Sequence, residues 1–386
     1  MVNIFKFFYN NLNILISSKL VFTKPPKKKI LIYDEVGSEL ILRNLNKDIA
    51  HIFYSRLNKG IKTSLNIYII LKLIFKFNLS KINYLKLYLK YVNPKLIITL
   101  IDNNETFYHL KKYTKCKTMF IQGAMRHSLN DIFSENKKPK EKNLSVDYML
   151  VFNDVTGKKY KSFLKGDVVQ IGSFRSNTNL KRSIKKKIDL IYISTFRDFE
   201  DSDIFSPINN TLWKDYRKNE VKLFKIIYDY LKKEKIKLTI LGSKRQHSEK
   251  EHNYFKNYFD PKYLKFIPQE KKRPTYSMID NSKLVITCDS TLGYEALSRG
   301  NKTAFFSIRG ENYPLNARKF GSFVKMKKKG PYWTNSATKK EFYRVINYLK
   351  NVKQKEFAKK ISFFRSNLCH YDSGNRKFKS IIKKIK

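Results

Sequence analysis

The sequence predicts an α/β protein made of two doubly wound domains that face each other across a cleft. Short apolar runs typical of buried strands alternate with helical segments, which indicates parallel sheets. The alternation occurs twice, on either side of a polar stretch without apolar periodicity at residues 176–187, which we interpret as a linker. With 386 residues, 42% of them hydrophobic and 15% aromatic, the chain can bury two cores and is not disordered.

The first predicted domain spans residues 28–175 and begins with the run KKILIYD, a short apolar strand that ends in polar residues. Gly37 then lies in a turn that opens a helix. Further strands are expected at residues 50–54, 95–100, 117–121, 148–152 and 168–171, with helices at residues 65–77 and 82–91.

The second predicted domain spans residues 188–350 and repeats the pattern. Strands are expected at residues 188–193, 236–241, 263–267, 283–287 and 303–307. Helices are expected at residues 219–232, 247–258, 276–281, 293–298 and 339–350. Residues 351–386 are expected to form a C-terminal helix and a basic tail.

The chain is strongly basic, with 80 Lys and Arg against 32 Asp and Glu and a formal net charge of +48. This charge favours contact with anionic lipid, nucleic acid or phosphorylated substrates and does not choose among them. The abundance of Ile, Asn, Lys, Tyr and Phe is equally expected of an AT-rich genome. No pattern typical of specific nucleic-acid binding is present.

The cysteines and the apolar runs indicate a cytoplasmic protein. The three cysteines are widely spaced and form no CxxC pair, so neither a disulfide framework nor a zinc site is expected. The most apolar run, residues 65–77, is too short to span a membrane. The apolar and basic segment at residues 1–27 either lies on the inner face of the cytoplasmic membrane or packs on the protein itself.

The segment from Asp289 to Gly300 carries the most chemical information. It follows the strand KLVIT, and it places Ser290 and Thr291 at a helix N-terminus, where free N–H groups and the helix dipole favour phosphate. Gly293 permits close backbone approach, and Glu295 lies one turn into the helix, within reach of a sugar hydroxyl. The alternative is an ordinary N-cap on a helix packed against the sheet. Neither GxGxxG nor GxxxxGK[ST] is present, which disfavours dehydrogenase and P-loop functions.

Residues 289–307 resemble the nucleotide-binding segment of GT-B-fold glycosyltransferases, which carry S-T-x-G-x-E-A-L-x-x-G followed by a strand. Residues 120–126, 172–177 and 192–197 resemble the bacterial surface carbohydrate biosynthesis protein family. The resemblance covers about residues 28–320. It implies a GT-B-like enzyme that moves a sugar from a nucleotide-sugar donor to a saccharide or lipid-linked saccharide acceptor in surface polysaccharide synthesis of the O-antigen or capsule type.

The resemblance also implies roles for individual residues. Ser290 and Thr291 would hold donor phosphate and Glu295 the ribose or sugar, while basic residues after the strands would neutralise the leaving diphosphate. These basic residues are alternatively solvated charges. The residues expected to bind the nucleotide-sugar are Ser194, Thr195, Arg197, Gly242, Lys244, Arg245, Asp289, Ser290, Thr291, Gly293 and Glu295.

An inverting transferase needs a general base for the acceptor hydroxyl, and His127 and Asp102 are the candidates. Asp102 alternatively orients His127, and each is alternatively a structural cap or loop residue. Acceptor-binding residues are expected around the ends of the first-domain strands, at Asp34, Glu35, Gly37, Gln122 and Arg126.

We expect neither a metal nor a cofactor, because GT-B enzymes usually stabilise the leaving group with a helix dipole and cationic side chains. The letters DxD occur at residues 201–203, in an acidic loop that does not directly follow a strand.

Two other functions remain open from the sequence. A polyol-phosphate transferase or a sugar-nucleotide epimerase of the same fold would share the phosphate-binding helix. A non-catalytic basic protein would bind anionic partners, including inner-leaflet lipid, through charge alone.

Overall fold

The computed structural model describes residues 18–54, 64–127, 131–134, 138–141, 143–179, 186–196, 207–243, 248–270, 273–308 and 319–385. Its contacts divide the chain into two compact units. The first comprises Met1–Gly123, Pro139–Thr178 and Asn375–Lys386, and the second comprises Ala124–Lys138 and Asn179–Gly374.

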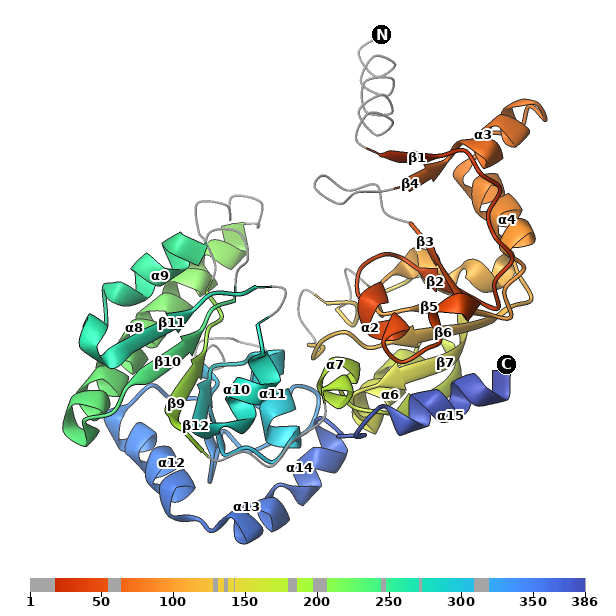
Figure 1. Ribbon diagram of the computed structural model, residues 1–386. Coiled ribbons are helices and arrows are strands. Elements are labelled where there is room, and N and C mark those ends of the chain that lie inside the picture. The colour runs from red at the N-terminus through yellow and green to blue at the C-terminus, as the bar shows by residue number, and fades with distance from the viewer. Residues whose placement is uncertain are drawn as a thin grey trace. The chain divides into compact units, whose positions relative to one another are not determined.

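The first unit contains a six-stranded parallel sheet in the order β3-β2-β5-β6-β7-β8 (Figure 1). Strands β2 and β5 are buried along their whole length, because helices cover both faces of such a sheet. The strands are β2 Ile30–Tyr33, β3 Ala50–Phe53, β5 Leu96–Thr99, β6 Lys117–Ile121, β7 Ser145–Val151 and β8 Lys165–Gln170. The helices are α2 Ser38–Leu42, α3 Ile67–Ile74, α4 Lys81–Val92, α5 Glu105–Tyr108, α6 Asp154–Lys161 and α7 Phe174–Thr178.

A separate two-stranded sheet precedes helix α3 and is absent from the sequence-based expectations. Strand β1, Lys19–Val21, pairs in parallel with β4, Ser64–Asn66. The helix expected at residues 65–77 consequently begins at Ile67, where the Asn66 side chain accepts the Ile69 N–H and caps it.

The C-terminal helix α15, Arg376–Ile385, belongs to the first unit, whereas the sequence analysis expected residues 351–386 to be a separate C-terminal helix and basic tail. Its Phe378 and Ile382 are buried in the core of the first sheet, together with Ile30 and Ile98. The Phe378 ring packs edge-on against Phe174, with 4.9 Å between ring centroids. The tail therefore completes a core that begins about 350 residues earlier in the chain. Figure 1 shows this helix, in dark blue, beside α6 and α7.

The second unit contains a seven-stranded sheet in the order β11-β10-β9-β12-β13-β15-β14. All neighbours are parallel except β14 and β15. The strands are β9 Ile188–Ile193, β10 Leu238–Leu241, β11 Leu264–Ile267, β12 Ser282–Thr287, β13 Thr303–Phe306, β14 Lys329–Gly330 and β15 Trp333–Thr334. The helices are α8 Pro207–Glu234, α9 Ser248–Lys256, α10 Thr275–Asp280, α11 Thr291–Ser298, α12 Lys339–Asn351, α13 Gln354–Lys360 and α14 Ser362–Asn367.

Each sheet has one point at which its strand order reverses. In the first sheet this point lies between β2 and β5, and in the second between β9 and β12. Ligands of doubly wound sheets bind outside the carboxyl ends of the strands at such points. The predicted pair of doubly wound, Rossmann-like domains is confirmed, while the cleft between them stays a prediction. Of the helices in the described part of the chain, none combines the length and apolarity that a membrane span requires.

Candidate functional site

The N-terminus of α11 lies at the reversal point of the second sheet. Ser290 is the N-cap, and its Oγ accepts the Leu292 N–H at 3.3 Å. The Ser290 N–H in turn donates to Thr287 Oγ1, at the end of β12, at 3.2 Å. The predicted strand-to-helix turn is therefore present, and its first-turn N–H groups provide the partial positive charge that favours an anion.

Gly293 fits α11 closely against the sheet. A Cβ atom at this position would lie only 2.4 Å from Thr287 Cγ2. The residue therefore brings helix and strand together, whereas the sequence suggested close approach to a ligand.

Glu295 is buried one turn into α11. Its Oε2 accepts the hydroxyl proton of Tyr276, on α10, at 2.8 Å. The carboxylate of the predicted ribose- or sugar-binding residue therefore makes a contact between two adjacent helices (Figure 1).

A buried ion pair fixes α10 to the end of α11. Arg299 Nε donates to Asp280 Oδ1 at 3.0 Å, its second nitrogen Nη2 bonds Asp280 Oδ2, and the guanidinium lies over the Tyr276 ring. Burial alone would lower the pKa of Arg299, but the hydrogen bond and charge of Asp280 outweigh burial and raise that pKa. This pair therefore connects the C-terminal end of α11 to the end of α10.

The carboxyl ends of β9 and β10 are joined by Glu251, a residue of α9 that the sequence analysis missed. Its fully buried carboxylate accepts hydrogen bonds from Ser194 Oγ at 2.5 Å, from the Ser243 N–H at 2.9 Å and from Ser243 Oγ at 3.2 Å. Thr195, which was also predicted to bind the nucleotide-sugar, is buried as well. Glu251 lies 57 residues from Ser194, so no local pattern indicates the pairing.

A second missed residue, Arg273, braces the ends of β10 and β11. Its Nη1 donates to the carbonyls of Gly242 at 2.8 Å, Ile267 at 3.1 Å and Pro268 at 3.2 Å. Burial lowers the pKa of Arg273, although the charge of Glu251 opposes this effect. A Cβ atom at Gly242 would come within 2.9 Å of the Phe266 ring, so glycine is needed there for packing. The predicted Arg197, Lys244 and Arg245, and the DxD letters at residues 201–203, lie outside the described residues.

The segment that carries Arg126 and His127 lies in the second unit, whereas the sequence places it in the first domain. Its Met125 N–H donates to Thr291 Oγ1, at the start of α11, at 3.1 Å. Asp131 accepts the His127 N–H at 3.0 Å and forms an ion pair with Arg126 at 3.1 Å. The predicted base His127 is therefore buried. It lies two residues after Met125, which directly contacts the predicted phosphate-binding helix.

Asp102 and Gln122 stabilise the turns of the first sheet. Asp102 is fully buried, and its carboxylate accepts the Gly123 N–H at 3.0 Å and the Tyr160 hydroxyl at 2.5 Å. Gln122 Oε1 accepts the Phe152 N–H at 2.8 Å. Both residues therefore have structural partners, and Asp102 and His127 belong to different units.

The turn after β2 has an unusual backbone. Asp34 has a φ of 107°, a value that side chains rarely adopt, and its Oδ1 accepts the Val36 N–H at 3.0 Å. Gly37 has a φ of 79°, and a Cβ atom there would lie 2.3 Å from the Leu100 side chain, which follows β5. Asp34 and Gly37, two of the predicted acceptor-binding residues, therefore shape the turn at the reversal point of the first sheet. A strained backbone, such as the positive φ of Asp34, is typical of functional turns.

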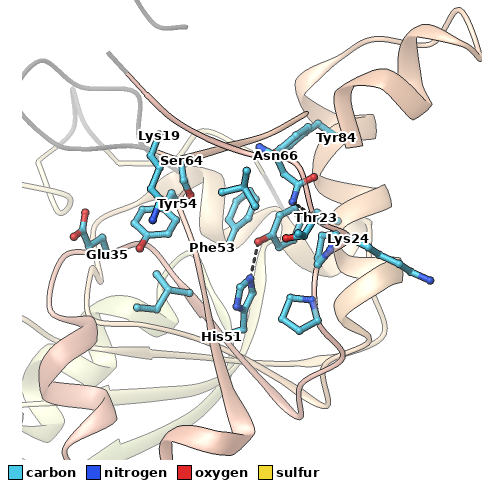
Figure 2. A pocket seen from close by; sticks show the side chains of 15 residues that line it. Lys19, Thr23, Lys24, Glu35, His51, Phe53, Tyr54, Ser64, Asn66 and Tyr84 are labelled. Atoms are coloured by element: carbon cyan, nitrogen blue, oxygen red, sulfur yellow. Dashed lines mark hydrogen bonds between the residues drawn. The ribbon is translucent and has the colours of Figure 1, made fainter. Parts of the chain in front are cut away.

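A pocket of about 340 Å³ opens in the first unit (Figure 2). Glu35, a predicted acceptor residue, lies in its wall, with the aromatic rings of Phe53, Tyr54 and Tyr84. His51 Nε2 is 2.7 Å from the Tyr88 hydroxyl, and burial and the charge of Lys28 lower the pKa of His51. A pocket with aromatic walls and a few polar groups suits a small ligand that has both polar and apolar surfaces.

The described residues contain no group of three or more His, Cys, Asp or Glu side chains arranged to hold a metal ion.

Two Rossmann-like units in one chain define the GT-B-like class of proteins, and solved structures of this class match the chain. A variant of the wall teichoic acid polymerase TagF is 13% identical, with a TM-score of 0.54, over 93% of this chain and 89% of that chain. The UDP-GlcNAc 2-epimerase of Methanocaldococcus jannaschii, in complex with UDP-GlcNAc and UDP, is 12% identical, with a TM-score of 0.51, over 95% and 99%. These identities show the fold alone.

The chain belongs to the protein family described as "putative O-antigen biosynthesis protein", whose model matches residues 119–386. No curated protein sequence matches the chain significantly. The predicted surface polysaccharide biosynthesis family and its GT-B-like fold are therefore confirmed.

Proposed function

We propose that the protein is a glycosyltransferase that transfers a sugar from a nucleotide-sugar donor during the synthesis of O-antigen-type surface polysaccharide. Membership of the O-antigen biosynthesis family supports a role in that pathway, and the GT-B-like fold supports an enzymatic activity. The contact between Met125 N–H and Thr291 Oγ1 carries the proposal, because it joins the candidate base segment to the candidate phosphate-binding helix within one unit.

The donor diphosphate would bind at the N-terminus of α11. Ser290 caps this helix, and the Thr291 hydroxyl, which accepts the Met125 N–H, can also donate its own proton. A phosphate oxygen in that place would accept from Thr291 and from the first-turn N–H groups. Arg197, Lys244 and Arg245 remain the proposed cationic partners of the diphosphate.

The chemical step of an inverting transfer would use His127. Its imidazole takes the proton of the acceptor hydroxyl, whose oxygen forms a bond to the anomeric carbon while the bond from that carbon to the diphosphate oxygen breaks. The departing nucleoside diphosphate carries the electron pair of this bond, and the α11 N-terminus stabilises its charge. The pocket beside Glu35 is the proposed site for the saccharide or lipid-linked saccharide acceptor.

A thermal-shift screen with UDP, GDP, CMP, CDP and dTDP tests the donor site, since a ligand that binds only the folded state raises the melting temperature. We expect one nucleotide to raise it in the wild type and to raise it less in Ser290→Ala. Thr338→Ala is the matched control, because Thr338 caps α12 in the same way, accepting the Glu341 N–H. Equal small shifts for every nucleotide that disappear with added salt would instead identify a charge-based binding protein.

Polyol-phosphate transfer is the second candidate, because a TagF structure soaked with CDPG matches 97% of the chain with a TM-score of 0.53. The acceptor oxygen would then attack phosphorus and release a nucleoside monophosphate. Incubation with activated donors that carry the nucleotide identified by the screen separates the possibilities. A released diphosphate supports glycosyl transfer, a monophosphate supports polyol-phosphate transfer, and an isomerised donor supports epimerisation.

A further inference from the structure

The turn between α3 and α4 exposes an unusual concentration of apolar side chains. In the described part of the chain, ten large apolar side chains are exposed, and six of them lie within residues 71–82. We name these six the apolar tip: Leu71 at 48% exposure, Ile74 at 49%, Phe75 at 80%, Phe77 at 100%, Leu79 at 61% and Ile82 at 46%. Such a concentration on a soluble surface marks an interaction site.

The apolar tip is not a displaced part of the core. The opposite faces of the same helices are buried, through Ile69 and Leu73 of α3 and through Leu85 and Leu89 of α4. The hairpin is therefore anchored by one set of side chains and presents another set to solvent. Figure 1 shows that the turn points away from the six-stranded sheet of its own unit.

The backbone of the turn is fixed by hydrogen bonds. The Phe77 N–H donates to the Ile74 carbonyl at 2.9 Å, and the Asn78 N–H donates to the Leu73 carbonyl at 3.0 Å. Phe77 has a φ of 50°, in the left-handed region that favours Gly or Asn. The Phe77 side chain is wholly exposed at this position, so it buries no apolar surface of its own.

The charge around the apolar tip has one sign. Lys72, Lys76 and Lys81 are exposed between its apolar residues, and no Asp or Glu occurs between Asp48 and Asp102. Apolar side chains interleaved with lysines match an anionic bilayer, whose acyl chains receive the former and whose phosphates attract the latter. A second copy of the chain would bring like charges together. Nucleic acid could stack bases on Phe75 and Phe77, but it offers no apolar layer for the four aliphatic side chains of the tip.

We propose that the apolar tip docks the protein on an anionic membrane surface, with Phe75, Phe77 and Leu79 inserted among the acyl chains and the three lysines at the lipid phosphates. This docking does not depend on the reaction proposed above. It would hold the first unit, with its aromatic pocket, next to the membrane.

Vesicle co-sedimentation of the full chain tests the apolar part of this proposal. The vesicles contain phosphatidylcholine alone or equimolar phosphatidylcholine and phosphatidylglycerol. The wild type should bind the second kind, and Phe75→Ser/Phe77→Asn/Leu79→Ser should bind it at least about tenfold more weakly. Phe363→Ser is the control, since Phe363 is 55% exposed on α14. Because all these side chains are exposed, the melting temperature should not change.

The charge part is tested with Lys72→Gln/Lys76→Gln/Lys81→Gln against Lys355→Gln/Lys359→Gln/Lys360→Gln, which removes the same charge from exposed positions around α13. Only the first variant should lose affinity. A Phe77→Trp variant places a tryptophan in the apolar tip. Brominated lipid should quench the tryptophan fluorescence of this variant more strongly than that of the wild type.

Three results would overturn the proposal. The triple apolar variant could bind vesicles as the wild type does, which would place the contact elsewhere, for example in residues 1–27. The Phe363→Ser control could lose binding equally. Light scattering could show that the triple variant changes the oligomeric state while vesicle binding stays the same, which would identify a second copy as the partner.

Discussion

Thr291 Oγ1 accepts the Met125 N–H at 3.1 Å, and this bond links two segments that are 166 residues apart. One segment begins the helix at the reversal point of the second sheet, and the other carries Arg126 and His127. A single hydroxyl thus holds the candidate base segment against the candidate phosphate site. The role of this hydroxyl can be tested by substitution, because serine keeps the hydroxyl group and valine removes it.

Thr291→Val should lower the free energy of unfolding by about 1–3 kcal/mol, since the Met125 N–H loses its acceptor in a largely buried place. It should also weaken binding of the nucleotide that the thermal-shift screen identifies. Thr291→Ser should retain most of the free energy of unfolding and most of the affinity for the nucleotide. Urea denaturation and calorimetric titration provide the measurements, and equal effects of the two substitutions would show that the hydroxyl is not responsible.

Glu251→Gln should destabilise the second unit by about 1–3 kcal/mol, because an amide NH₂ would face donors that now meet carboxylate oxygens. The matched control is Glu234→Gln. Glu234 pairs with Lys350 at 2.6 Å near the surface, where an ion pair contributes less than about 1 kcal/mol. Urea denaturation of both variants provides the comparison, and similar losses would contradict a special role for Glu251.

Phe378→Ala should cost about 3–5 kcal/mol, the usual loss for removing a buried phenylalanine side chain. Phe363→Ala, at an exposed position, should change stability by less than about 0.5 kcal/mol. Amide exchange should locate the effect: β2 and β5 should exchange faster in Phe378→Ala, and β9 and β12 should not. Faster exchange in β9 would refute the placement of α15 in the first unit's core.

Local patterns in the sequence were sufficient to predict most strands and the start of α11. The run ILIY at residues 30–33 is wholly buried, and Ser290 caps the helix that follows β12, as its position after KLVIT indicates. These features depend on neighbouring residues, whose periodicity and capping chemistry are visible in the sequence.

Contacts between distant residues could not be predicted in this way. Glu251 meets Ser194 across 57 residues, and Asn375 donates to Thr178 Oγ1 across 197 residues. Nothing in the residues around Glu251 distinguishes it from Glu249, which is on the same helix turn. Likewise, the basic C-terminal sequence resembles a solvated tail, and only the packing of Phe378 shows that it closes a core.

His51 should make the stability of the first unit depend on pH. Burial and the charge of Lys28 lower the pKa of His51 below its usual value of about 6.5. The unfolded chain therefore binds a proton at His51 at a higher pH than the folded chain does. Its contribution to stability is complete above about pH 6.5 and is lost as the pH falls from there toward the lower, folded-state pKa.

The measurement is urea denaturation of the wild type and of His51→Gln at about pH 7.5 and pH 5.5, a range in which histidine is the side chain that ordinarily titrates. The wild type should lose more stability than His51→Gln when the pH is lowered, and the difference removes contributions shared by both proteins. His252→Gln controls for another histidine whose pKa burial lowers. Amide exchange should increase in β3 and α4, which hold His51 and its partner Tyr88. A pH dependence that is identical in the wild type and in His51→Gln would show that His51 titrates alike in the folded and unfolded chain.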